Sequence, residues 1–337
     1  MLYIDILFLG LSILLYLLLG GADFGAGIIE LFSSEVTKNK TRQLTYRAIG
    51  PIWEANHMWL IITIVILFVG FPVVYSTLSV HLHIPLLVML FGIIARGTAF
   101  VFRHYDAVKD DMQKVYNLIF VYSSFITPFF LGIIAGSLIG GKINLQATTF
   151  QDAFIAPWFN LFSISVGLFT VCICGFLAAV YLIGEAQNQE DIKIFIRKAK
   201  RMNILTVLAG ALVFVIAEVD GIPLYRGLLT NKISLLAIIA ASISLFFLWD
   251  YLLKNKAKNI VRILSGFQIT MILFAVGYEY FPAFIMLSDG NYITLIEDTA
   301  PQSTLSALAW ALIIGSVFIL PALFYLYYSF QHKEHEY

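Results

Sequence analysis

The sequence predicts an all-α membrane protein that crosses the bilayer about nine times. Hydrophobic residues make up 60% of its 337 residues and charged residues only 12%, whereas a soluble domain carries roughly a quarter charged residues. The mean hydropathy is +0.87. Apolar runs of about 20 residues, the length that spans a bilayer as a helix, recur along the chain. A polytopic membrane protein is therefore the predicted fold class.

Nine apolar windows can each form a membrane-spanning helix. Their approximate extents are 4–32, 50–76, 80–104, 115–140, 155–186, 202–219, 232–253, 259–282 and 304–330. The first and fifth windows are longer than about 20 residues, so we expect tilt or extension beyond the membrane. The first window lacks the basic segment and cleavage site of a removable signal peptide, which favours a retained helix. Residues 1–337 are predicted to form a single integral membrane domain.

Lysine and arginine residues concentrate in the links after the odd-numbered windows. These are Lys38, Lys40, Arg42, Arg47, Arg103, Lys109, Lys114, Lys193, Arg197, Lys198, Lys200, Arg201, Lys254, Lys256, Lys258, Arg262 and Lys333. The opposite links hold Lys142, Arg226 and Lys232. The positive-inside rule then places the N-terminus outside and the C-terminus in the cytoplasm, as an odd number of spans requires. The loop 288–302 is expected outside, where its length allows it to fold over the bundle.

The prolines fit this arrangement. Pro128 and Pro321 lie inside the fourth and ninth windows, where neighbouring helices can satisfy the backbone carbonyl that a proline frees. Pro51, Pro85 and Pro157 lie near helix starts, where proline is well accommodated. We therefore expect the prolines to bend or begin helices without interrupting the nine spans.

The first of three polar patches is "GGADFGAGIIE", residues 20–30. Gly21 and Gly25 have the small-xxx-small spacing that permits close helix approach. Asp23 and Glu30 are seven apart and share one helix face. The patch is either a tightly packed helix with one satisfied aspartate or the acidic lining of an internal polar path.

The second patch, "GPIWEANHMWL" at residues 50–60, places Glu54 and His57 on one helix face. A Glu-x-x-His pair can be half of a di-iron site, which needs a second such pair, and none occurs in this chain. The remaining histidines offer no facing pair at one depth, and Cys172 and Cys174 are interpreted as packing residues. We therefore expect no metal and no haem to be bound by this chain alone.

The third patch is "ARGTAFVFRH", residues 95–104, with Arg96 and Arg103 seven apart on one stripe. Arg103 is near enough to the helix end to reach the membrane surface. Arg96 lies about 10 Å deeper by helix rise and needs a partner. Asp23 lies the same seven residues deeper than Glu30, so the acidic and basic stripes match in depth.

The three patches supply three carboxylates, from Asp23, Glu30 and Glu54, against two guanidinium groups, from Arg96 and Arg103. If all five meet, one carboxylate lacks a cationic partner and favours its neutral form. Such a group inside a membrane is a candidate proton carrier. The alternative is a structural ion network that pins three helices together, and the residues alone leave both interpretations open.

The motifs "GADFGAG", "GPIWEANHMWL" and "RGTAFVFR", in this order, resemble subunit II of the cytochrome bd quinol oxidases. The number of spans, the chain length and the orientation agree with this resemblance. It implies two four-helix bundles plus a peripheral helix, paired with subunit I about a pseudo-twofold axis. It also implies a complex in the bacterial cytoplasmic membrane that oxidises quinol and reduces dioxygen to water.

The resemblance further implies that subunit I holds two b-type haems, one haem d and most of the quinol site. This chain would then bind no redox cofactor itself, with a structural quinone and a small single-helix third subunit left open. Membrane lipids are its other expected partners. Nucleic acid is excluded because no basic stripe lies on a soluble face.

The resemblance also implies roles for residues of this chain. In the family, the acidic residue of a W-[DE]-x-N motif in the second helix is associated with proton delivery from the cytoplasm, and that position is Glu54 here. No residue is expected to be directly catalytic. The proton-path candidates are Glu54, Asp23 and His57, the supporting charges are Arg96, Arg103 and Glu30, and the motif residues are Trp53, Asn56 and Trp59.

Two other functions compete with this interpretation. A secondary transporter would use the same intramembrane charges, but transporters often repeat interrupted helices in corresponding halves. Here the charges cluster in the first three windows, with no clear echo in the fifth to seventh. A purely structural membrane subunit stays open. Copurification of a partner with the red-region absorption of haem d would discriminate among the three.

Overall fold

The computed structural model describes all residues except 51–52, 106–111, 187, 255–258 and 334–337. Pro51, Lys109, Lys256, Lys258 and His335, which entered the sequence-based predictions, lie outside the described residues. The described chain is almost entirely helical, with one short β-hairpin. The predicted all-α membrane fold class is confirmed.

Nine helices of the described chain are long and apolar enough to cross a membrane, as predicted. They are α1 (Leu2–Leu15) continued by η1 (Tyr16–Gly20) and α2 (Gly21–Leu31), then α4 (Trp53–Gly70), α6 (His83–Tyr105), α7 (Met112–Ile139), α9 (Leu161–Glu185), α10 (Gln189–Val219), α12 (Lys232–Leu253), α13 (Asn259–Tyr280) and α14 (Gln302–Lys333). The remaining helices are short or polar and lie at the two ends of the bundle.

Three predicted boundaries are wrong. The fifth window was expected to begin at residue 155, but α9 begins at Leu161, where the side chain of Asn160 caps the helix by accepting from the amide of Ser163. The second window was expected to run to residue 76, but α4 ends at Gly70 and a separate helix α5 (Pro72–His81) follows. Pro72 disfavours helical geometry at the residue before it, and Phe71 is non-helical with φ −132° and ψ 63°. The sixth window was expected to begin at residue 202. Instead α10 begins at Gln189, because the charged residues before the apolar stretch continue the same helix.

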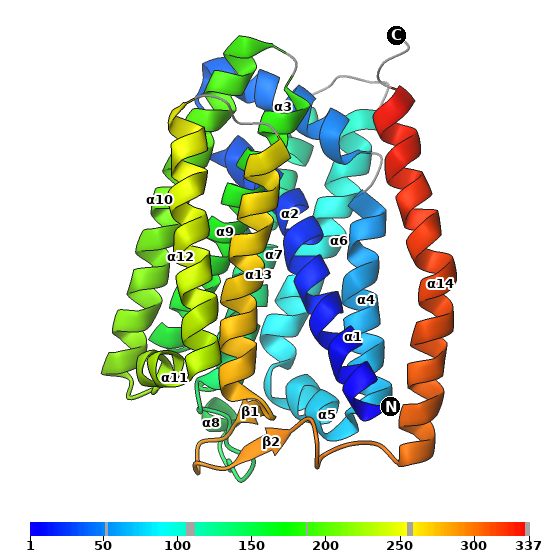
Figure 1. The fold of residues 1–337 in the computed structure, drawn as a ribbon, viewed down its shortest axis with the longest axis vertical. Helices are drawn as coiled ribbons and strands as arrows, with labels where there is room; N and C mark the ends of the chain where they lie inside the picture. The colour runs from blue at the N-terminus through cyan, green and yellow to red at the C-terminus, as the bar shows by residue number, and fades with distance from the viewer. Residues whose placement is uncertain (51–52, 106–111, 187, 255–258, 334–337) are drawn as a thin grey trace.

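The two ends of the bundle differ (Figure 1). Helix α3 (Glu35–Ile49) lies at one end, here called the α3 end. The opposite end, where α1 begins, is here called the α5 end and also holds α8 (Phe150–Phe154) and α11 (Leu224–Thr230). Because α14 runs from the α5 end to the α3 end, the described chain starts and finishes on opposite sides of the bundle, as an odd number of spans requires.

A β-hairpin also lies at the α5 end. Strands β1 (Ala283–Met286) and β2 (Tyr292–Thr294) pair antiparallel, and Gly290 between them adopts φ +86°. The amide of Ser288 donates to the carbonyl of Ile143 at 2.9 Å, and the amide of Ala300 donates to the carbonyl of Gly70 at 2.9 Å. The loop 288–302 therefore folds against the ends of the helices.

Helix α9 is the centre of the fold, where it packs against α2, α7, α10 and α13. Of its most apolar stretch, 72% is buried, against 11% for α14, which lies at the periphery. A Cβ atom at Gly25 would lie 1.8 Å from the carbonyl oxygen of Cys174, so only glycine allows α2 and α9 to approach this closely. The four-residue spacing of Gly21 and Gly25 thus correctly predicted a close helix approach, which is made with α9. Cys172 and Cys174 are both free.

Candidate functional site

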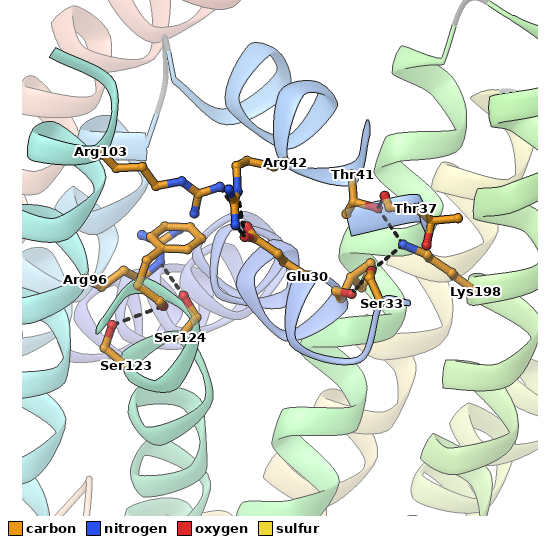
Figure 2. A network of polar contacts seen from close by, with 12 residues as sticks. Glu30, Ser33, Thr37, Thr41, Arg42, Arg96, Arg103, Ser123, Ser124 and Lys198 are labelled. Atoms are coloured by element: carbon orange, nitrogen blue, oxygen red, sulfur yellow. Dashed lines mark hydrogen bonds and ion pairs between the residues drawn. The ribbon is translucent and has the colours of Figure 1, made fainter. Parts of the chain in front are cut away.

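The buried carboxylate of Glu30 anchors a charge cluster at the α3 end (Figure 2). Its Oε1 accepts hydrogen bonds from Nε and Nη2 of Arg42, at 2.9 and 2.8 Å, and its Oε2 accepts one from Nη2 of Arg103 at 2.8 Å. Glu30 is completely buried and Arg103 is 8% exposed. Breaking a buried ion pair is costly, so this cluster ties α2, α3 and α6 together.

Arg42 was absent from the predicted charge network. The sequence predicts only Arg96 and Arg103 as the cations of this network, because hydropathy does not indicate which link residues fold back onto a membrane helix. Arg42 lies in α3, a polar helix that folds back over the α3 end and reaches the buried Glu30 from outside the apolar windows. One indication of this contact is present in the sequence: Arg42 lies in a link rich in lysine and arginine, and that link follows the helix that ends near Glu30.

Lys198 forms a second polar contact beside this cluster (Figure 2). Its Nζ donates to Oγ of Ser33 at 2.7 Å and to Oγ1 of Thr41 at 2.6 Å. The polar first turns of α10 bring Lys198 to this position, as they bring Asp191 to Lys40. The hydrogen bond to Asp191 raises the pKa of the exposed Lys40 ammonium. Helix α3 is therefore fixed to α10 as well as to α2.

Arg96 lies about 10 Å farther from the α3 end than Arg103 by helix rise, and it is 1% exposed. Its Nη2 donates to the backbone carbonyl of Asp23 at 2.8 Å, and its Nε donates to Oγ of Ser124 at 3.2 Å. The guanidinium also lies 5.1 Å from the ring centroid of Phe24, within the range of a cation–π contact. The predicted match in depth between Asp23 and Arg96 is confirmed, but the structure shows no direct ion pair between them among the described residues.

The carboxylate of Asp23 is held by the motif of the second span. Asn56 donates from Nδ2 to Oδ2 of Asp23 at 2.7 Å, and both side chains are buried. Asn56 lies on the inner stripe of α4, with Thr63 and Gly70 at seven-residue spacing, and both of these are buried too. The motif asparagine therefore fixes the aspartate of α2 against α4.

Glu54 is exposed and faces away from this interior. It lies on the outer stripe of α4 with Ile61 and Phe68, which are 60% and 61% exposed. Helical geometry separates Glu54 from Asn56 by about 200° around the axis. The five charged side chains therefore do not meet in one network, because Glu54 faces the outer surface of the bundle. Neither sequence spacing nor hydropathy reveals how a helix is rotated about its axis.

His57 lies between the two faces of α4 and is half-buried. Its ring centroid is 5.6 Å from that of Phe24, 6.0 Å from that of Tyr16 and 6.3 Å from that of Trp53. Trp59, the other motif tryptophan, is buried in the same aromatic cluster. The motif thus contributes Trp53 to the aromatic surroundings of His57, and Asn56 to the contact with Asp23.

The structure describes the side chains of three histidines, and His57 lies apart from the other two. His57 is in the second turn of α4, whereas His81 ends α5 and His83 begins α6, and both of these lie near Phe154. Nδ1 of His81 is 3.0 Å from the carbonyl oxygen of Ala153. Within the described ranges, no group of three or more histidine, cysteine, aspartate or glutamate residues is arranged to hold a metal ion.

A second charge cluster joins α9 and α13. Nη2 of Arg262 donates to Oε1 of Glu185 at 2.6 Å and also to the carbonyl of Tyr181. No clear echo of the first charge patches was expected in the fifth to seventh windows. Glu185 lies at the end of the fifth window, whereas Arg262 lies in the eighth, so this pair joins two windows that the prediction did not compare.

Comparison with known proteins gives a consistent result. A family model described as cytochrome bd terminal oxidase subunit II matches residues 1–330. Cytochrome bd ubiquinol oxidase subunit 2 of Bacillus subtilis is 24% identical to this chain, covering 98% of this chain and 96% of the relative. Cytochrome bd-I ubiquinol oxidase subunit 2 of Escherichia coli K12 is 21% identical, covering 91% and 88%.

The fold is also similar to a solved structure. A chain of the bd oxidase from Geobacillus thermodenitrificans superposes with a TM-score of 0.77 at 19% identity. The match covers 97% of this chain and 98% of that one, so the whole helical arrangement is shared.

Proposed function

Because the chain belongs to the cytochrome bd terminal oxidase subunit II family, it is a subunit of a quinol-oxidising complex, and we propose that it delivers protons to that complex. Reduction of dioxygen to water consumes protons. Drawing them from the cytoplasm adds to the membrane potential. The family membership, rather than any lack of charge in the later helices, argues against a transporter.

The single observation that carries this proposal is the division of α4 into two polar faces near the α3 end. Glu54 is exposed on the outer face, and Asn56 holds the carboxylate of Asp23 on the inner face. The carboxyl groups of Glu54 and Asp23 are thus placed on opposite sides of the first turn of α4. This turn is near the α3 end, where lysine and arginine residues are concentrated. Titratable groups inside a membrane are costly and typically serve ion or proton movement.

We also propose the setting of this route. The α3 end faces the cytoplasm and the α5 end faces outside, following the distribution of lysine and arginine. The haem-bearing subunit I covers the outer stripe of α4, because a carboxylate facing lipid is unfavourable. The haems and the main quinol site belong to subunit I. The cluster of Glu30, Arg42 and Arg103 holds α2 and α6 in fixed positions beside Glu54 and Asp23.

The test is oxygen consumption by the purified complex with Glu54→Gln and Glu54→Asp, each expressed per haem d. Glutamine keeps the shape but removes the exchangeable proton, so quinol-driven uptake should fall by roughly tenfold or more. Aspartate keeps the acid and should retain much of the rate. Glu190→Gln is the matched control, because Glu190 is an exposed carboxylate at the same end. A wild-type rate in Glu54→Gln would make Glu54 a structural charge.

A further inference from the structure

Two polar atoms are buried beside each other between the first and second spans without a visible role. They are the hydroxyl oxygen of Tyr16 and Nδ1 of His57, and neither has a hydrogen-bond partner among the residues that the structure describes. The two ring centroids are 6.0 Å apart, and Tyr16 is 4% exposed. Buried polar groups in proteins are nearly always hydrogen-bonded to protein or to ordered water.

The backbone is shaped around Tyr16. It begins the π-helical segment Tyr16–Gly20, in which the amide of Gly21 donates to the carbonyl of Tyr16, five residues earlier. A Cβ atom at Gly20 would lie 2.9 Å from the tyrosine ring, so the glycine leaves room for that ring. Single π-helical turns inside α-helices are frequent at functional sites. The first span therefore departs from regular geometry where it holds this hydroxyl group.

The surroundings combine apolar walls with nearby charge. The rings of Phe24 and Trp59 pack around Tyr16 in one buried cluster. The Arg96 guanidinium lies 5.1 Å from the ring centroid of Phe24, and that centroid lies 6.3 Å from the ring centroid of Tyr16 and 5.6 Å from that of His57. A buried water typically makes two to four hydrogen bonds to polar groups that are otherwise unsatisfied. The two unsatisfied atoms supply the minimum number of such partners.

His57 also connects the two faces of α4. It is three residues from Glu54, hence on a neighbouring part of the helix surface, and directly follows Asn56, which holds Asp23. Its half-buried ring has one nitrogen directed into the interior. A proton moving between the exposed and the buried carboxyl group would therefore pass this imidazole.

We propose that Tyr16 and His57 bind a buried water molecule that passes protons between Glu54 and Asp23. This inference rests on the proposed proton-delivery function and adds a residue to it. The water accepts a proton that comes from Glu54 and releases another proton toward Asp23. One O–H bond forms as another breaks, and the water is unchanged after each transfer. Tyr16 is a positioning residue, since its hydroxyl orients the water.

The experiment uses the intact complex with Tyr16→Phe and, as the matched control, Tyr3→Phe. Tyr3 lies in the same membrane span and is 69% exposed. Tyr16→Phe should leave the haem d content normal and lower oxygen uptake by roughly tenfold, less than the loss of a direct proton-transfer group commonly causes. The solvent deuterium isotope effect on uptake should rise in this variant. A high-resolution map of the wild-type complex should show one water between the two rings.

Two further variants separate water binding from packing. His57→Gln retains a side chain that can hydrogen-bond to water, so most of the oxygen uptake rate should remain. His57→Leu removes this hydrogen bond and should lower the rate as Tyr16→Phe does. A wild-type rate and isotope effect in Tyr16→Phe, or a map in which the tyrosine hydroxyl bonds directly to protein, would overturn the inference. If Glu54→Gln is slow in the same assay while Tyr16→Phe is not, only this inference fails. A wild-type rate in Glu54→Gln instead refutes the proposed function.

Discussion

Replacing Glu30 by glutamine should destabilise the complex because it leaves two arginines without their shared carboxylate. Arg103 is almost fully buried, and removing one partner of a buried ion pair costs about 3–5 kcal/mol. The side chain of Arg42 is 26% exposed, so its contribution is reduced by solvent to about 0–1 kcal/mol. Glutamine retains one side-chain oxygen as an acceptor, which places the expected loss near the lower end, at about 3 kcal/mol.

The assay is thermal and chemical unfolding of the detergent-solubilised complex, followed by haem d absorbance and by retention of both subunits. Glu185→Gln is the control, because the side chains of Glu185 and Arg262 are 33% and 24% exposed and their pair should contribute about 1 kcal/mol or less. Glu30→Gln should therefore be clearly less stable than Glu185→Gln. Equal stability of the two variants would refute the assignment of Glu30 as the buried anchor of the α3 end.

Two other variants test separate parts of the structure. His57→Ala should leave all three haem signals of the complex intact, because His57 has an aromatic environment and no facing histidine in the described chain; loss of one haem band in an assembled complex would show that it is a ligand. Gly25→Val should prevent stable assembly, since even a Cβ atom there would lie 1.8 Å from the carbonyl oxygen of Cys174. Gly10→Val should assemble normally and serves as the control, because a Cβ atom added at Gly10 would meet no heavy atom of the described chain within 4 Å.

The nine spans could be predicted because hydropathy and length are local properties of the chain. Their ends were less predictable where polar helix continues an apolar one, as in the first turns of α10, or where a proline divides a window, as Pro72 does. The close approach at Gly25 was also accessible, since small residues at four-residue spacing have few other uses in a membrane helix.

The composition of the site was only partly predictable. Glu30 and Arg103 were paired correctly by depth, since both follow from helix rise along their own spans. Arg42 and Lys198 reach the site from outside the apolar windows, so they depend on the tertiary fold. The outward direction of Glu54 and the π-helical turn at Tyr16 depend on packing between helices, which sequence spacing alone does not encode.

The most direct test of proton delivery is proton uptake during a single turnover of the fully reduced complex. The complex is mixed with oxygen in weakly buffered solution, and a pH-indicating dye follows the protons taken from the medium. We predict that Glu54→Gln delays this uptake by roughly tenfold or more, whereas Glu190→Gln matches the wild type. Proton uptake at the wild-type rate in Glu54→Gln, with haem d content intact, would contradict proton delivery through Glu54.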